Sequence, residues 1–454
     1  MATNTSSIFE HVTSVLIQSR SPAVYKLTPQ KEKIGNLTKV TVGRKRMQQN
    51  KTILLVGETG TGKSTLINAL VNYAMGVKWE DNIWFKIVEE QSGNQCESQT
   101  SEVTVYEIFG FEGKTLPHSL TIIDTPGYGD TGGVEHDDIV SQRLLDLFRT
   151  EDGVHEINAV GLVLKSTVNR LSDRLSYIFD SVLSLFGKNM EDSIVALITH
   201  SPGRQPKNAL KALEGAKIKC AKDNKNQPVY FLFDNCQTED REEDPDALEF
   251  ANEITVRGIR RFADFLERSE PKSLQMTVHV MNERMGLKTS VKNLKDQIKI
   301  IQARKDEFQR QAESFPSFLS LFFSGIQVIG TIVENIWLDE SFQHITKLEQ
   351  IALNTDSLST HEHLDFLIRR MEEKGDADAD KIQKLKEIKS RVDGGIQAGL
   401  RILGEHPEAD SHSLLILQPK TASHSGEEES VGKEQEKASR PSDTDRHDLI
   451  RDNS

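Results

Sequence analysis

The feature that most constrains the fold of this chain is a glycine-rich segment directly after a short apolar run. The run ILLV at residues 53–56 leads into GETGTGKST at residues 57–65, and a helical pattern begins at once afterwards. Glycines let backbone N–H groups surround an anion, and the following helix directs its positive end at the same anion. This order of strand, loop and helix predicts a phosphate-binding loop.

The predicted loop consists of nine consecutive residues with separate expected roles. They are Gly57, Glu58, Thr59, Gly60, Thr61, Gly62, Lys63, Ser64 and Thr65. In loops of this type the lysine reaches the β- and γ-phosphates, and the next hydroxyl ligates Mg²⁺. We therefore expect a catalytic role for Lys63 and a metal-binding role for Ser64. A glycine-rich turn that binds no ligand is the alternative.

A second motif, SLTIIDTPGYGD, follows about sixty residues later and places Asp124 at the end of an apolar strand. We expect Asp124 to hold Mg²⁺ through water and the N–H of Gly127 to contact a γ-phosphate. Between the two motifs, Thr100 is the predicted switch threonine that completes the Mg²⁺ shell and serves catalysis. Thr104 is the alternative, although its alternating neighbours Val103 and Val105 are typical of an ordinary strand.

Short β-branched runs alternate with helical patterns after residue 50, which is typical of a mainly parallel sheet flanked by helices. We therefore predict a three-layer α/β P-loop domain, followed by a helical region and a disordered tail. The predicted boundaries are an N-terminal extension at residues 1–48, the P-loop domain at 49–268, the helical region at 269–403 and the tail at 404–454.

Composition excludes some partners and favours a cytoplasmic location. Lys and Arg number 56 against 69 Asp and Glu, a formal net charge of −13, so no general field attracts nucleic acid. The three cysteines, Cys96, Cys220 and Cys236, cannot form a disulfide framework in a chain of this length. The N-terminal residues lack the pattern of a signal peptide.

The helical region contains a stretch without Asp, Glu, Lys or Arg at residues 314–333. It is about as long as a minimal membrane span of roughly 17 to 25 residues, but Pro316, Gly325, Gln327 and Gly330 interrupt it. We expect a buried core helix, and membrane association through this stretch is the alternative.

Residues 51–267 resemble the septin and immunity-associated (paraseptin) branch of P-loop GTPases, to which the chloroplast envelope import GTPases are related. The resemblance rests on GETGTGKST, SQTSEV, DTPGYGD and ITHS, which recur in septin-like proteins known mainly from fish. It implies binding of GTP and GDP with Mg²⁺, and a nucleotide-switched regulatory or assembly-forming GTPase. An ATP-binding P-loop protein and a nucleotide-binding scaffold without turnover are the alternatives.

Two departures from other GTPases affect base recognition and hydrolysis. The chain reads THSP at residues 199–202, where most GTPases carry Asn-Lys-x-Asp. The resemblance to the import GTPases implies that His200 occupies the base loop, with base reading completed by Asp234 and Asn235; an ordinary loop histidine and a turn are the alternative. Tyr128 stands where a water-positioning glutamine would lie, so we expect slow hydrolysis. The resemblance to this branch implies a nucleotide-dependent homodimer or oligomer that would speed it.

Overall fold

The computed structural model describes most of the chain before residue 392. The described residues are 8–34, 37–45, 49–88, 103–125, 133–312, 316–355, 357–374 and 379–391. The chain divides into two compact units, Met1–Pro407 and Glu408–Ser454, and every described residue belongs to the first. The predicted tail at residues 404–454 lies outside the described residues.

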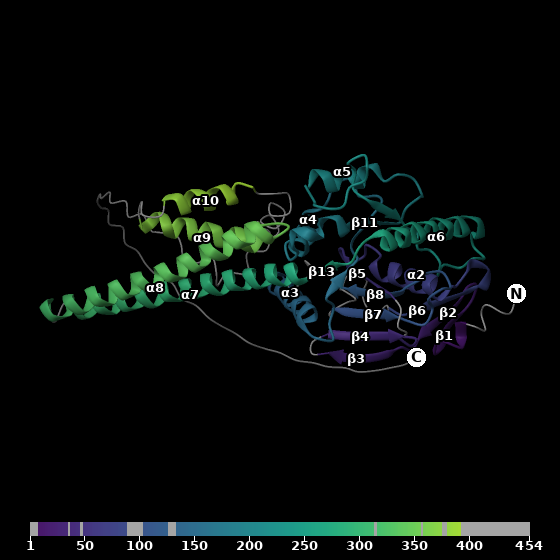
Figure 1. Cartoon of the computed structure of the whole chain (residues 1–454), viewed down its shortest axis with the longest axis horizontal. Coiled ribbons are helices and arrows are strands. Elements are labelled where there is room, and N and C mark those ends of the chain that lie inside the picture. Colours follow the sequence, from purple (N-terminus) through teal and green to yellow (C-terminus); the bar gives the residue numbers. More distant parts are fainter. Residues whose placement is uncertain are drawn as a thin grey trace, which may run out of the picture. The chain divides into compact units, whose positions relative to one another are not determined.

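Eight strands form the central sheet (Figure 1): β3 (Gln30–Ile34), β4 (Leu37–Val42), β5 (Asn50–Val56), β7 (Thr104–Ile108), β8 (Ser119–Asp124), β10 (Ala159–Lys165), β11 (Ile194–Thr199) and β12 (Tyr230–Leu232). Their order across the sheet is β12-β11-β10-β5-β8-β7-β4-β3. The strands from β12 to β8 are parallel, whereas β7 is antiparallel to β8 and β3 is antiparallel to β4. The predicted mainly parallel sheet is confirmed, with a mixed end formed by β7, β4 and β3.

Helices cover both faces of this sheet: α2 (Lys63–Met75), α3 (Gly133–Arg149), α4 (Asp173–Leu183), α5 (Lys207–Gly215) and α6 (Pro245–Arg268). Successive side chains of a strand point to opposite faces. Accordingly, Ile53 and Leu55 of β5 belong to the core that contains residues of α2 and α6. Leu54 and Val56 belong to the core that contains residues of α3, α4 and α5. The predicted three-layer architecture is therefore confirmed.

Two hairpins before residue 48 pack as parts of the same α/β fold. β3 and β4 extend the central sheet, while β1 (Ser14–Ser19) and β2 (Ala23–Leu27) form a second sheet with β6 (Ile83–Lys86). β2 is antiparallel to β1 and parallel to β6. Shorter elements are η1 (Trp79–Asp81), β9 (Glu156–Ile157), η2 (Lys188–Ser193) and β13 (Lys272–Ser273). The domain boundaries themselves stay predictions.

The last four helices have a core of their own, which confirms the predicted helical region. They are α7 (Gln275–Ala312), α8 (Pro316–Ile351), α9 (Leu358–Lys374) and α10 (Ala379–Lys389). The long helices α7 and α8 lie side by side (Figure 1). Leu287 and Leu294 of α7 are buried with Leu338 and Ile345 of α8, because each helix directs its apolar residues at spacings of three and four toward the other.

Arg284 of α7 connects the helical region to the α/β layers. Its guanidinium donates hydrogen bonds to Ser184 O at 2.9 Å, just after α4, and to Asn354 O at 2.5 Å, just after α8. Nearby, Leu353 N donates to Phe186 O at 2.8 Å, and Asn354 Nδ2 donates to Asp180 Oδ1 at 3.2 Å. The C-terminal end of α4 is therefore held to the segment that follows α8.

The uncharged stretch at residues 314–333 falls mostly within α8, and its described side chains do not form a core. Val328, Ile329 and Ile332 are exposed, and only Gly330 is buried among the side chains described between residues 324 and 333. The expected buried core helix is therefore wrong for these residues. Among the residues that the structure describes, no helix combines the length and the apolar character that crossing a membrane requires.

Candidate nucleotide-binding site

The predicted phosphate loop lies between the buried end of β5 and the start of α2. Gly60 and Gly62 adopt left-handed backbone angles, with φ of 79° and 92°, which favour glycine at both positions. Gly57 is restricted for another reason, because an added Cβ would lie 2.5 Å from Val163 O of β10. The sequence therefore folds into a loop that packs tightly against the sheet and then turns directly into a helix.

Lys63 is the first residue of α2, and its ammonium folds back over the loop. Nζ donates hydrogen bonds to the carbonyl oxygens of Gly57 and Glu58, and the side chain is buried. Thr61 closes the same loop, since its N and Oγ1 both donate to Glu58 O, at 3.2 and 2.7 Å. The positive charge of Lys63 is thus held inside the predicted phosphate loop.

The N-terminus of α2 adds to this positive region. Its cap, Gly62, has no side chain to accept from the first N–H groups, and the first turn carries no acidic residue. The helix dipole and the N–H groups of the first turn therefore favour an anion at this end. Ser64 and Thr65 lie in the same turn and are half-buried.

Asp124 lies beside the loop because β8 pairs with β5. Asp124 is opposite Leu55, two residues before Gly57, and its side chain is fully buried. Thr125 Oγ1 donates to Leu55 O at 2.9 Å and holds the chain at this point. The carboxylate of Asp124 and the hydroxyl of Ser64 are hard oxygen donors, the ligand type that Mg²⁺ prefers, so the residues present fit this ion.

The switch residues are only partly described. Thr100, Gly127 and Tyr128 lie outside the described residues, so their predicted contacts stay predictions. Thr104, the alternative switch threonine, is the first residue of β7 and lies directly opposite Asp124 in the antiparallel pair. The structure therefore brings the alternative threonine next to the predicted Mg²⁺ carboxylate.

The predicted base-reading residues follow two neighbouring parallel strands. His200 comes directly after β11 with a positive φ of 49°, and Asp234 and Asn235 come shortly after β12. Parallel neighbours end at the same edge of the sheet, and Ser201 N donates to Phe233 O at 3.0 Å across the two loops. The structure therefore brings these three residues to one edge of the sheet.

Thr255 of α6 holds the loop that contains Asp234 and Asn235. Its Oγ1 accepts from Asp234 N at 3.0 Å and lies 2.8 Å from Asp234 O and 3.2 Å from Asn235 Oδ1. The Thr255 side chain is buried. Sequence reasoning missed this residue. The available signal was a threonine on the apolar face of α6, beside Ile254, Gly258 and Ile259, because a buried hydroxyl needs a hydrogen-bond partner.

Burial changes the pKa values of Asp234 and Cys236, in the loop after β12. Burial raises the pKa of Asp234, while the nearby Cys236 thiol and the charge of His200 oppose that change. Cys236 Sγ donates to Asp234 Oδ1 at 3.5 Å, and burial together with the Asp234 carboxylate raises the pKa of Cys236 to about 12. Cys236 therefore stays a thiol at neutral pH and acts as a weak hydrogen-bond donor.

Thr199, the last residue of β11, connects that strand to the phosphate loop. Its Oγ1 donates to Thr61 O at 2.6 Å, although the two residues are 138 positions apart, and the side chain is buried. An added Cβ on Gly62 would lie 3.5 Å from the Thr199 methyl carbon. Sequence reasoning missed this contact because it depends on the pairing of strands that are distant in the chain.

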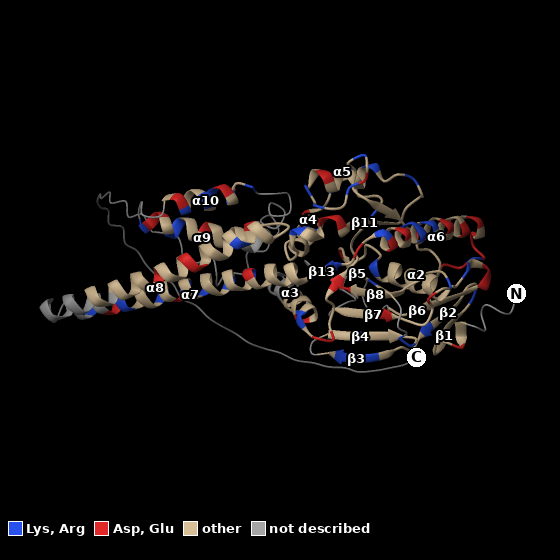
Figure 2. Cartoon of the chain, in the orientation of Figure 1, with Lys and Arg blue, Asp and Glu red and all other residues tan. Residues whose placement is uncertain are grey.

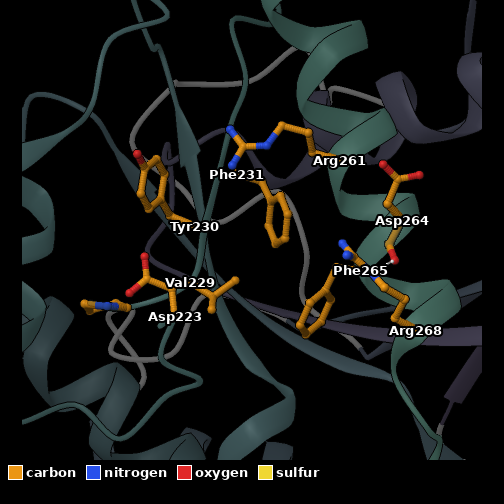
Figure 3. Close-up of a pocket in the computed structure, with 9 residues that line it drawn as sticks. Asp223, Val229, Tyr230, Phe231, Arg261, Asp264, Phe265 and Arg268 are labelled. Carbon is orange, nitrogen blue, oxygen red and sulfur yellow. Dashed lines mark hydrogen bonds between the residues drawn. The ribbon is translucent and has the colours of Figure 1, made fainter. Parts of the chain in front are cut away.

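A pocket of about 410 Å³ lies elsewhere, between β12 and α6 (Figure 3). Phe231 of β12 and Arg261, Phe265 and Arg268 of α6 contribute to its lining. None of the predicted phosphate, metal or base-reading residues lines it. The predicted nucleotide site therefore rests on the loops at the ends of β5, β8, β11 and β12 and not on this pocket.

The comparison with known protein families covers the phosphate loop and Asp124 but not the loops after β11 and β12. The Septin family model matches residues 48–140, which include the phosphate loop and Asp124. No curated protein matches the chain.

Solved structures similar to this chain include Toc33 from Arabidopsis thaliana in complex with Mg²⁺ and GMPPNP. That structure is 18% identical, covers 49% of this chain and 88% of its own, and has a TM-score of 0.32. Toc33 in complex with GDP and Mg²⁺ is 16% identical, with coverages of 49% and 87% and a TM-score of 0.32. The Septin family model alone makes residues 48–140 septin-like in sequence, and the immunity-associated and fish-type assignment stays a prediction.

Proposed function

We propose that this chain is a GTP-binding protein that acts as a nucleotide-switched regulatory or assembly-forming GTPase. The observation that carries the proposal is the phosphate loop, in which Lys63 is folded over residues 57–61 beside the buried Asp124. The match of residues 48–140 to the Septin family supports the same function.

Different residues of the chain would bind different groups of the nucleotide. Backbone N–H groups of the loop and the start of α2 bind phosphate oxygens, and Lys63 neutralises charge on the β- and γ-phosphates. Ser64 and Asp124 would hold Mg²⁺, with Thr100 joining in the triphosphate state. When bound, Mg²⁺ supplies neutralisation of the developing phosphate charge.

Guanine selection is the second part of the proposal. The carboxylate of Asp234 can accept from both N1–H and N2–H₂ of guanine, whereas adenine presents an acceptor at N1. Thr255 holds the backbone of Asp234, and Cys236 Sγ donates to the Asp234 carboxylate. Asn235 and His200 lie in the same pair of loops and would line the base.

Nucleotide titration of the purified full chain tests both parts. We expect Lys63→Ala to weaken GTP binding while the wild-type chain prefers GTP to ATP. Wild-type affinity in Lys63→Ala would place the phosphate site elsewhere, and equal affinity for GTP and ATP would favour the ATP-binding alternative. Nucleotide extracted from the purified chain gives an independent identification.

Slow hydrolysis and assembly are the third part. Tyr128 cannot orient water as an amide side chain does, so a partner surface must complete the site and exclude water. Turnover per molecule is therefore expected to rise with protein concentration. Binding without turnover in a single-turnover measurement, at any concentration, would favour the scaffold alternative.

A further inference from the structure

The outer face of α8 carries a contiguous apolar stripe that no described element covers. Val328, Ile329, Ile332 and Ile336 have exposed fractions of 59%, 63%, 54% and 57%. Isolated exposed aliphatic side chains are ordinary, but a contiguous group on one face indicates a binding surface. We call these four residues the α8 stripe.

The stripe points away from the contacts that hold α8 in place. On the inner side, Gly330 packs against Ile301 of α7, since an added Cβ would lie 2.8 Å from Ile301 Cδ1. Glu334 forms an ion pair with Arg370 of α9, and Leu338 is buried in the helical core. Residues two positions apart on a helix lie on nearly opposite sides. The stripe residues Val328, Ile332 and Ile336 therefore face outward.

The spacing of the stripe is that of a coiled-coil seam. Ile329, Ile332 and Ile336 are separated by three and four residues, and Gly325 precedes Ile329 by four. Such a 3-4 repeat keeps one apolar seam on one side of a helix, facing a partner helix. Further along the same face the exposed residues become charged or polar, at Asp339, Gln343, Lys347 and Gln350. The seam therefore ends where α8 enters the helical core.

The charges around the stripe distinguish between partners. Residues 324–333 carry no charge, and the corresponding part of α8 in Figure 2 is neither red nor blue. Helices that lie on anionic lipid carry Lys and Arg beside their apolar face. Of the lysines on the neighbouring α7, Lys295 lies toward α9, 5.1 Å from the ring centroid of Phe366. A second uncharged seam, by contrast, meets no like charge.

We propose that the α8 stripe binds the α8 stripe of a second copy of this chain. Four half-exposed aliphatic side chains supply roughly 250 to 400 Å² per copy. The two copies together would bury less than the roughly 1,200 Å² of a standard stable interface. The association is therefore reversible, and it is independent of the nucleotide-dependent assembly proposed above.

Sedimentation of the full chain over a range of concentrations tests the proposal. We expect the wild-type chain to self-associate and Ile332→Asp to weaken the association by about tenfold or more, because a carboxylate replaces a central seam residue. Thr331→Asp is the matched control, since Thr331 is exposed on the same helix but outside the stripe, and it should associate as the wild type does. Circular dichroism checks that all three chains are equally helical.

Two further measurements separate this association from the other possibilities. Lys63→Ala should keep it, with or without nucleotide, whereas the nucleotide-dependent assembly is lost in that variant. Under mild oxidation Ile332→Cys should form a covalent dimer that Thr331→Cys does not form.

Three results would overturn the proposal. A single monomeric mass up to about 100 µM would exclude a useful affinity. Unchanged association in Ile332→Asp would place the contact elsewhere. A chain that stays monomeric in solution and floats with phosphatidylcholine–phosphatidylserine vesicles would assign the stripe to a lipid surface.

Discussion

Replacing Thr199 by valine should weaken nucleotide binding although Thr199 is not expected to touch the nucleotide. Valine keeps the shape of threonine but removes the hydroxyl that donates to Thr61 O at 2.6 Å. Because both residues are buried, no water replaces this bond at low cost. The carbonyl of Thr61, in the middle of the phosphate loop, would lose this donor.

The magnitude follows from the burial of that carbonyl. A buried acceptor left without its partner costs about 1 to 3 kcal/mol. This bond fixes the conformation of the phosphate loop. Losing it therefore lowers the fraction of molecules whose loop can bind nucleotide. Apparent affinity falls with that fraction, so we expect a loss of roughly 5- to 150-fold.

Thr199→Ser is the matched control, since it keeps the hydroxyl and removes only the methyl group that packs near Gly62. Equilibrium titration with a fluorescent GTP analogue compares the three chains, and urea unfolding reports their stability. Serine should bind nearly as the wild type does. If valine binds normally and serine weakly, packing and not the hydrogen bond positions the loop.

Three other predictions concern the same loops, and a fourth concerns the buried His118. Lys63→Ala should weaken GTP binding by roughly 10- to 150-fold in the same titration, because a charged hydrogen-bond donor is worth about 1.5 to 3 kcal/mol. Thr255→Val should lower the preference for GTP over ATP, whereas Thr255→Ser should keep it, because only the hydroxyl holds the backbone of Asp234. The raised pKa of Asp234 means that its carboxylate takes up a proton at a higher pH than an ordinary aspartate. On acidification, GTP affinity should therefore begin to fall at a higher pH than it would for an aspartate with the ordinary pKa of 3.8. Asp234→Asn should show no such fall. Finally, burial lowers the pKa of His118 from 6.5 to about 4, so the unfolded chain takes up a proton in this range that the folded chain does not. The free energy of unfolding should fall as pH drops through this window, by at most about 3 kcal/mol, and His118→Gln should reduce the dependence in pH-resolved urea unfolding.

Local patterns in the sequence were sufficient for much of the fold. β5, the loop and α2 were predictable because an apolar run, a set of glycines and a helical pattern follow one another without interruption. β8 was predictable in the same way from the apolar residues before Asp124. The early strands were not, since β3 reads QKEKI, and its mostly exposed polar residues give no apolar alternation.

Contacts between distant residues could not be read from the sequence. Thr199 and Thr61 meet only because β11, β10 and β5 are neighbours in the sheet. The outward direction of the α8 stripe was equally hidden. An uncharged helix has the same composition whether its neighbours cover all of it or one side, and only the contacts of Gly330, Glu334 and Leu338 decide which side is covered.

The absence of Asn-Lys-x-Asp after β11 changes which element supports base recognition. In this chain the loop after β11 carries His200 and no carboxylate, and the acidic residue lies after β12. That residue is held by Thr255, which belongs to α6 and not to the sheet. α6 also packs against β12 closely, since an added Cβ on Gly258 would lie 1.9 Å from Leu232 O. If Asp234 reads guanine as proposed, the position of α6 determines base selectivity, and substitutions at Gly258 should change the GTP-to-ATP ratio before they change phosphate binding.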